Sequence, residues 1–179
     1  MKSRVWTIGA MMMTLSMLMG GCGKEEAKPV DIVEGVDKCD VCHMNVANDH
    51  NASEIVLQNG KVLKFDDIGC MYRWTKEHEN EQVEARFVRD YLSKEWVNTD
   101  QATYVYDKTF QTPMGYGVYS FKDKAAAEAF VKEKQTGSVM SVQDLDKHAW
   151  ESSMKKHGQS DGHPESGQHG TSDAQKTHN

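Results

Sequence analysis

Hydrophobic and polar residues alternate over the stretch SEIVLQNGKVLKFDD and predict two strands joined by a tight turn. The alternation covers residues 54–57 and 61–65, and the Asn59-Gly60 pair between them suits a hairpin turn. A period of two residues is typical of strands that bury one face. We therefore expect a β-hairpin in this stretch.

A helix is expected directly after this hairpin. Asp66 or Asp67 can cap its N-terminus, because a short acidic side chain there accepts hydrogen bonds from free backbone N–H groups. Apolar side chains then recur at helical spacing, which places four residues on one buried face: Ile68, Met71, Tyr72 and Thr75. The stretch VEARFVRDYL, residues 83–92, follows as a further strand.

The same order of elements recurs in the second half of the chain. Strands are predicted in ATYVYD (102–107), GYGVYSF (115–121) and SVMSVQDL (138–145), and a helix closed by Gly137 is predicted in KDKAAAEAFVKEK (122–134). An offset of about 56 residues places Phe65 on Phe121 and Trp74 on Phe130, with Asp90 near Asp144. We predict an α+β fold in which two β-β-α-β units, related by an internal duplication, form a single compact domain.

Composition divides the chain into further parts. Residues 22–36 are charged and poor in large apolar side chains, as expected of a flexible, disordered spacer, and residues 37–150 form the domain. Residues 151–179 are rich in Ser, Gly, Gln, Lys, Asp and His and are expected to be a disordered tail. Scattered histidines in this tail suit either weak Cu(II) or Zn(II) binding or a solvated linker: His157, His163, His169 and His178.

A secretory signal is predicted at the N-terminus. Lys2 and Arg4 precede a largely apolar run over residues 5–19, which is shorter than the roughly 20 residues of a membrane-spanning helix. The run ends in GGCG, which resembles the lipobox of bacterial lipoproteins, so we expect residues 1–21 to be removed and Cys22 to be lipidated. An uncleaved anchor is the alternative. Both interpretations place the remaining chain outside the cytoplasm, at the cell surface or the periplasmic side, tethered to a bacterial membrane.

Charge and cysteine content narrow the range of partners. The formal net charge of −6 gives the protein no electrostatic reason to bind nucleic acid. Besides Cys22 there are three cysteines, Cys39, Cys42 and Cys70, and an odd number cannot all pair within one chain. Because unpaired thiols outside the cytoplasm tend to be oxidised, a metal site suits them better than a disulfide scaffold.

The string CDVCHM, residues 39–44, combines a C-x-x-C pair with histidine and methionine. A thioredoxin-like redox site needs this pair at the start of a helix that follows a central strand, and no strong strand precedes it. A structural zinc site needs four ligands, usually from a second pair, which the sequence lacks. Copper(I) fits better, because this soft ion prefers thiolate and thioether sulfur and accepts two or three ligands.

Two methionines extend this sulfur set. Met44 follows Cys42 by two residues, so both side chains can project to one side of an extended segment. A proline and a glycine bracket Met114 in a predicted turn, where core packing gives no obvious reason for a large thioether. The sequence therefore predicts a copper(I) site formed by Cys42, Met44 and Met114, with Cys39 as a further ligand.

Four features occur in an order that is typical of one family. They are the lipoprotein signal, the CDVCHM string, the helix start FDDIGCMYRW and the loop TPMGYGVYSF, and together they resemble the NosL family of nitrous oxide reductase accessory lipoproteins over roughly residues 37–145. The resemblance implies a copper(I) chaperone with two β-β-α-β units, a fold shared in part with organomercury lyases. It also implies delivery of copper to the copper-sulfide centre of nitrous oxide reductase, together with an ABC-type transporter complex.

The resemblance can be carried over position by position. Cys42 and Met44 match the family's Cys-x-Met pair, Cys39 matches a frequent upstream cysteine, and Met114 matches the methionine of the second loop. His43 stands where many members have glycine, and it either adds a nitrogen ligand or faces solvent.

Three alternatives for individual residues and for the function stay open. Cys70 is either a small buried residue or a third thiolate of the site. We do not expect an enzyme, but one related to organomercury lyase would need two cooperating cysteines and an acid, for which Cys39 or Cys42 with Cys70 and Asp66 are candidates. A general extracytoplasmic metal-binding lipoprotein is the third functional class.

Overall fold

The computed structural model describes residues 26–153 of the chain. The predicted signal peptide (1–21), Cys22 and residues 154–179 of the predicted tail lie outside the described part, so the expectations about them stay predictions. Along the described residues the elements are β1 (Ser53–Leu57), β2 (Val62–Phe65), α1 (Ile68–Glu77), β3 (Val83–Arg89), β4 (Trp96–Asn98), the 3-10 turn η1 (Thr99–Gln101), β5 (Thr103–Tyr106), β6 (Val118–Phe121), α2 (Lys124–Lys134), β7 (Ser138–Met140) and α3 (Val142–Asp146). No helix in this part of the chain is long and apolar enough to cross a membrane.

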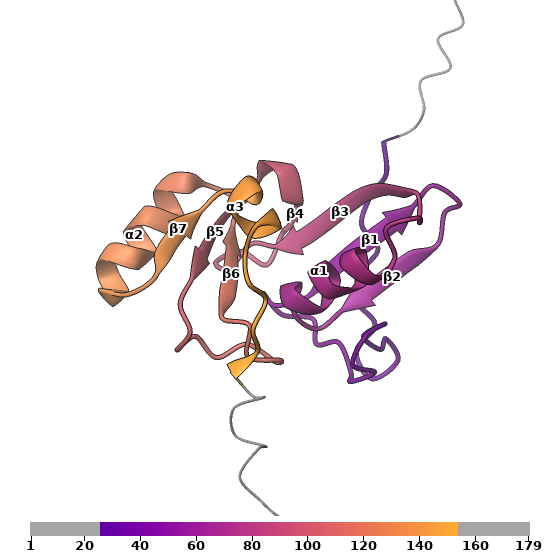
Figure 1. Cartoon of the computed structure of the whole chain (residues 1–179), viewed down its shortest axis with the longest axis horizontal. Helices are drawn as coiled ribbons and strands as arrows, with labels where there is room; N and C mark the ends of the chain where they lie inside the picture. The colour runs from indigo at the N-terminus through magenta and orange to yellow at the C-terminus, as the bar shows by residue number, and fades with distance from the viewer. Residues whose placement is uncertain (1–25, 154–179) are drawn as a thin grey trace, which may run out of the picture.

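Two antiparallel sheets lie side by side, each with its own helix (Figure 1). The first sheet has the order β2-β1-β3-β4 and packs against α1, and the second has the order β6-β5-β7 and packs against α2. The core of each unit therefore has the same strand order and the same β-β-α-β connection. The predicted α+β fold with two such units in one domain is confirmed.

The predicted offset between the halves is visible in the architecture. Phe65 and Phe121 each end the second strand of a unit, and Trp74 and Phe130 each lie in the helix. Asp90 and Asp144 are not equivalent, because Asp90 directly follows β3 whereas Asp144 lies within α3. The two units share their topology up to their last strand and differ after it.

The expectation of a strand over residues 138–145 is correct only for its first three residues. β7 ends at Met140, and Ser141 then starts α3 through a capping box in which its hydroxyl and the Asp144 carboxylate each bond the other residue's backbone. A Ser-x-x-Asp sequence favours a helix start over continued pairing. The short strand β4 was not predicted, since three residues are too few to show a period of two.

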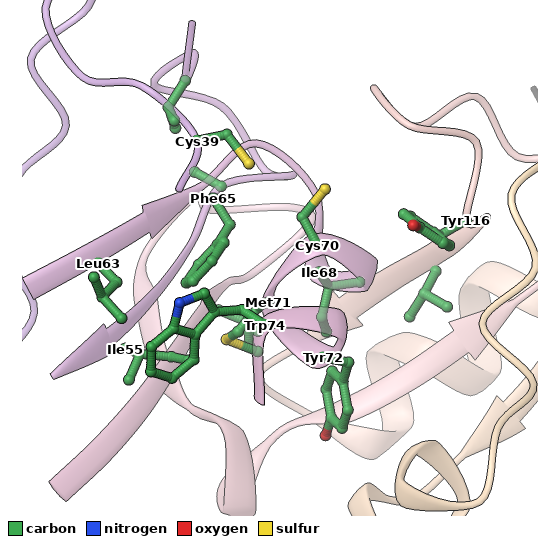
Figure 2. Packing of buried hydrophobic residues seen from close by; sticks show 14 of the residues in the cluster. Cys39, Ile55, Leu63, Phe65, Ile68, Cys70, Met71, Tyr72, Trp74 and Tyr116 are labelled. Carbon is green, nitrogen blue, oxygen red and sulfur yellow. The ribbon is translucent and has the colours of Figure 1, made fainter. Parts of the chain in front are cut away.

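α1 begins as the sequence indicates. Asp67 is the N-cap, and its carboxylate accepts a hydrogen bond from the backbone N–H of Gly69 at 3.0 Å. Figure 2 shows the buried face of the helix against the sheet, where Met71 and Trp74 pack with Phe65. Burial of side chains of this size stabilises the fold by about 2 kcal/mol each. Thr75, the last residue expected on this face, is only partly buried.

The loop before β6 packs on the start of α1. The backbone N–H of Met114 donates to the Asp67 carboxylate at 3.0 Å, and the Tyr116 ring lies directly on Gly69. A methyl group added at Gly69 would overlap that ring. Glycine at this position therefore allows the second unit's loop to approach the first unit's helix.

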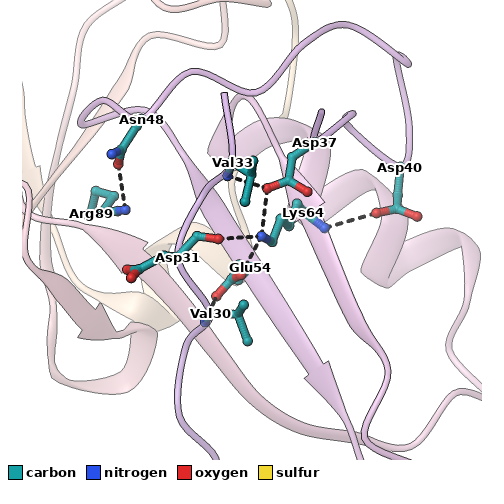
Figure 3. Close-up of polar contacts among 9 residues, drawn as sticks. All are labelled: Val30, Asp31, Val33, Asp37, Asp40, Asn48, Glu54, Lys64 and Arg89. Carbon is teal, nitrogen blue, oxygen red and sulfur yellow. Dashed lines mark hydrogen bonds and ion pairs between the residues drawn. The ribbon is translucent and has the colours of Figure 1, made fainter. Parts of the chain in front are cut away.

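Residues 30–37 cover the face of β1 and β2 that α1 does not cover (Figure 3). Lys64 on β2 is the centre of this contact, because its ammonium donates to the backbone oxygen of Asp31 and to the Asp37 carboxylate, each at 2.7 Å. Ile32 from the same segment is buried in the core. Only part of the expected spacer, residues 26–36, is described, and within it Val30 contacts Glu54 of β1.

Glu54 lies beneath this segment and is fully buried. Its carboxylate accepts a hydrogen bond from the backbone N–H of Val30 at 2.9 Å and lies 3.9 Å from the Lys64 ammonium. Burial is the largest influence on this group and raises its pKa to about 7. The folded protein therefore keeps a proton on Glu54 at pH values where the unfolded chain has lost it.

We expect this proton to make stability depend on pH. A group whose pKa is raised on folding lowers the free energy of unfolding as pH rises from its ordinary pKa, near 4.5, to about 7. Glu54→Gln should remove that contribution, which amounts to roughly 3 kcal/mol over the whole window. Urea unfolding at pH 5, 6 and 7 measures how the free energy of unfolding changes with pH. Glu79→Gln, which removes a carboxylate from the surface, is the control. Equal slopes in the parent and in Glu54→Gln would contradict the prediction.

Gly69→Ala should destabilise the protein by about 1–3 kcal/mol, because the added methyl group meets the Tyr116 ring. In a Tyr116→Ala background the same substitution should cost nothing or stabilise, since alanine favours a helix over glycine by about 1 kcal/mol. Urea unfolding of the two single variants and the double variant measures this coupling. An equal cost of Gly69→Ala in both backgrounds would show that Tyr116 is not the cause.

Candidate metal centre

The CDVCHM string forms a closed loop. The backbone N–H of Cys39 donates to the oxygen of Met44, and the N–H of His43 donates to the oxygen of Cys39, both at 2.9 Å. His43 has a φ of 62°, a left-handed conformation that side chains other than glycine seldom adopt. The turn at His43 lets the chain fold back within six residues, so both cysteines lie on one short, hydrogen-bonded loop.

Backbone and side-chain hydrogen bonds fasten this loop to β2. Asp40, between the two cysteines, donates its N–H to the oxygen of Lys64 and accepts the N–H of Lys64 with its carboxylate, both at 2.9 Å. The Lys64 ammonium binds Asp37 just before the loop. One residue of β2 therefore positions the loop from both sides.

Cys70 reaches the same place from the first turn of α1. The sulfur atoms of Cys39, Cys42 and Cys70 and a carboxylate oxygen of Asp66 all lie within 4.8 Å of one another. Figure 2 shows the sulfurs of Cys39 and Cys70 directed into the same space at the start of the helix. Cys39, Cys70 and Asp66 are buried and Cys42 is partly exposed, so the group, called here the thiol cluster, is open to solvent only at Cys42.

The thiol cluster holds one thiolate and two thiols. The Cys70 thiol and the backbone N–H groups of Val41, Cys42 and Asp66 donate to the Cys39 sulfur, and they lower the Cys39 pKa to about 4 against the effect of burial. Burial and the neighbouring Cys39 raise the pKa of Cys42 to about 12. The Cys70 pKa is raised as well, because its proton bonds the Cys39 thiolate.

Asp66 is the acidic member of the cluster. Its two carboxylate oxygens lie 3.4 Å and 3.3 Å from the Cys42 sulfur, which donates to them. Burial and the adjacent Cys39 thiolate raise the pKa of Asp66 to about 6. A negatively charged, sulfur-rich and nearly closed site of this kind attracts thiophilic cations.

The backbones of the two predicted methionine ligands contact residues of the cysteine loop and of the helix start. Met44, at the end of the loop, exposes 50% of its surface, and Met114 is partly buried against the core. Asp67 brings the Met114 loop to the start of α1, next to Asp66, through the hydrogen bond described above. His43 is exposed and is not a member of the thiol cluster. The role of Met44 and Met114 as ligands stays a prediction.

The sequence points less directly to two members of the thiol cluster. It leaves Cys70 open as a small buried residue or a third thiolate, and it offers Asp66 as a helix cap or as the acid of an enzyme. In the structure Asp67 caps the helix, which leaves Asp66 free to face the cysteines. The signal in the sequence is FDDIGC itself. It contains two aspartates where a helix cap needs only one, and the other, Asp66, lies four residues before Cys70.

Comparisons with known proteins agree with this architecture. The NosL family matches residues 29–150. No curated protein matches the chain at a significant level. Among solved structures, the chain is similar to the copper chaperone NosL from Shewanella denitrificans, with 23% identity and a TM-score of 0.53, over 65% of this chain and 96% of that one. That likeness shows the fold. The family match covers well over half of the sequence, and the chain therefore belongs to the NosL family.

Proposed function

We propose that the protein is a copper(I)-binding chaperone. The observation that carries the proposal is the convergence of three cysteine sulfurs within 4.8 Å, reached from two different parts of the chain. Thiolate sulfur is the preferred donor for Cu(I), and two or three such donors satisfy the ion. Similarity to a solved copper chaperone with the same fold, and membership of the same family, support copper as the cargo.

The exposure of the sulfur donors suits a protein that must also release its cargo. Cys39 and Cys70 are buried, Cys42 is partly exposed, and Met44 is half exposed. We infer that Cys42, Met44 and Met114 contact the ion on the side from which a partner can reach it, and that Cys39 supports them from within. Weak thioether donors on the open side make exchange with a partner's sulfur ligands easier than a fully buried thiolate set would.

The surroundings of this function are proposed from the sequence and the family. A lipidated Cys22 would tether the protein to the membrane on its extracytoplasmic side. The resemblance of the chain to nitrous oxide reductase accessory lipoproteins supports the copper-sulfide centre of that enzyme as the destination of the copper, which the chaperone would supply together with an ABC-type transporter complex. The acidic net charge supports no role in nucleic-acid binding.

The thiol cluster also contains the groups that a thiol-dependent enzyme would need. Cys39, Cys42, Cys70 and Asp66 place two or more thiols beside an acid, as an enzyme related to organomercury lyase would need. The chain belongs to the NosL family, and the resemblance to that family implies a chaperone, so family membership favours the chaperone over the enzyme. Assays of the reduced protein with an organomercurial should therefore show no turnover.

A competition titration against a copper(I) chelator tests the ligand assignment. The reduced full-length chain in detergent should bind about one Cu(I), and Cys42→Ser, Met44→Leu and Met114→Leu should each weaken binding by about tenfold or more, or roughly 1.4 kcal/mol. Met140→Leu, a methionine in β7, is the matched control and should leave the affinity unchanged.

Two outcomes would change the assignment. Loss of affinity only in Cys39→Ser, Cys42→Ser and Cys70→Ser would assign copper to the thiol cluster without the methionines. Parental affinity in every one of these variants would overturn the site.

Copper binding should also depend on pH. Cys42 and Cys70 are protonated thiols at neutral pH, and a thiol must lose its proton to bind the ion. Apparent Cu(I) affinity should therefore rise about tenfold per pH unit for each proton displaced. Chelator competition at pH 6.5, 7.5 and 8.5 measures this slope, and a flat profile would mean that neither thiol proton is displaced.

A further inference from the structure

We propose that Asp66 completes, with Cys39, Cys42 and Cys70, a four-ligand site for a divalent thiophilic cation of the Zn(II) class. The proposal starts from the position of the Asp66 carboxylate. Both of its oxygens face the Cys42 sulfur, at 3.4 Å and 3.3 Å, and the residue is 4% exposed. Within residues 26–153, no salt bridge to Asp66 from lysine or arginine occurs. A buried carboxylate without a cationic partner points to a cation that the site can take up.

The donor types distinguish this cation from Cu(I). Two or three sulfurs satisfy Cu(I), and a carboxylate oxygen is a hard donor for which that ion has little preference. Zn(II) takes four ligands in a tetrahedral arrangement and accepts both cysteine sulfur and aspartate oxygen. The sequence pairs only two ligands of a zinc site, Cys39 and Cys42, and the structure supplies two more from the start of α1, as Asp66 and Cys70.

Charge favours a divalent ion as well. With every ligand deprotonated, three thiolates and one carboxylate carry four negative charges in a mostly buried site. A dipositive ion neutralises twice as much of that charge as Cu(I) does. Because uncompensated charge is costly away from water, the fully deprotonated form of the thiol cluster suits the divalent ion better.

The geometry requires only a small contraction. Zinc-sulfur distances near 2.3 Å place the sulfurs of a tetrahedral site about 3.8 Å apart. The donor atoms of the thiol cluster lie within 4.8 Å of one another, so the widest separation must close by about 1 Å. Two donors come from the hydrogen-bonded loop at residues 39–44 and two from the start of α1, and the partly exposed Cys42 gives the ion its path of entry.

Cu(I) and the divalent ion cannot bind at the same time, because Cys42 is a ligand of both. Asp66 distinguishes the two binding modes, since the divalent ion needs its carboxylate as a ligand and Cu(I) does not. This inference uses the same cysteines as the proposed chaperone function but does not depend on it, since a divalent ion can bind whether or not copper does.

Cobalt(II) is the probe for the experiment, because it replaces Zn(II) and reports its ligands in its absorption spectrum. Co(II) is titrated into the reduced full-length chain in detergent, and Zn(II) is then added as a competitor. We expect thiolate-to-cobalt charge transfer, intense bands of tetrahedral cobalt, and loss of both on addition of one equivalent of Zn(II). Cobalt held only by the tail histidines would show no thiolate band, and that result would overturn the site.

Variants test the role of Asp66. Asp66→Asn should weaken Co(II) and Zn(II) binding by at least about tenfold while changing Cu(I) affinity by less than about threefold. Asp100→Asn, an exposed carboxylate outside the site, is the control. Asp66→Cys should keep a tetrahedral cobalt spectrum with a stronger thiolate band, which separates loss of a ligand from loss of the fold.

The outcomes separate the two proposals. Equal Co(II) affinity in the parent and in Asp66→Asn would overturn the four-ligand site and leave the copper proposal intact. Tetrahedral Co(II) binding without tight Cu(I) binding would overturn the chaperone function and support the inference drawn here.

Discussion

Asp66 and Asp67 are buried side by side between the end of β2 and the start of α1, and they face in different directions. Asp66 accepts from the Cys42 thiol, and Asp67 accepts from the backbone of Gly69 and of Met114. Burial raises the pKa of both carboxyl groups, so each depends on the donors around it to remain charged. The pair joins the cysteine loop, the first helix and the loop of the second unit at one point, and the three cysteines of the thiol cluster lie beside Asp66.

Alignment of the two units shows which features of the first unit recur in the second. With the offset of 56 residues, Asp67 corresponds to Asp123, the N-cap of α2, so the helix start is shared by both units. Asp66 corresponds to Lys122 and Cys70 to Ala126. The second unit therefore keeps an aspartate at the N-cap position, where its side chain makes no capping hydrogen bond, and it lacks the side chains of the thiol cluster. It contributes the Met114 loop, which packs on the start of α1.

Much of the fold could be predicted because it follows from local pattern. Alternation identified β1 and β2, helical spacing identified α1, and the Asn59-Gly60 turn has the positive φ at Gly60 that the pair favours. The pattern failed where elements were short, as at β4 and α3. The cysteine loop was evident from its own residues, whereas Cys70 and Asp66 join it only through the hydrogen bonds between the loop and Lys64 of β2 and through the direction of α1. A contact between residues 39 and 70 leaves no periodic trace in the sequence.

The contact of Val30 with Glu54 sets a limit on where the proposed chaperone can work. Val30 is the eighth residue after Cys22, and a fully extended chain of eight residues reaches at most about 28 Å. If Cys22 carries a lipid, the sheet that holds the cysteine loop cannot move farther than this from the bilayer. A partner that exchanges copper with the protein must then present its own metal site within a few nanometres of the membrane surface.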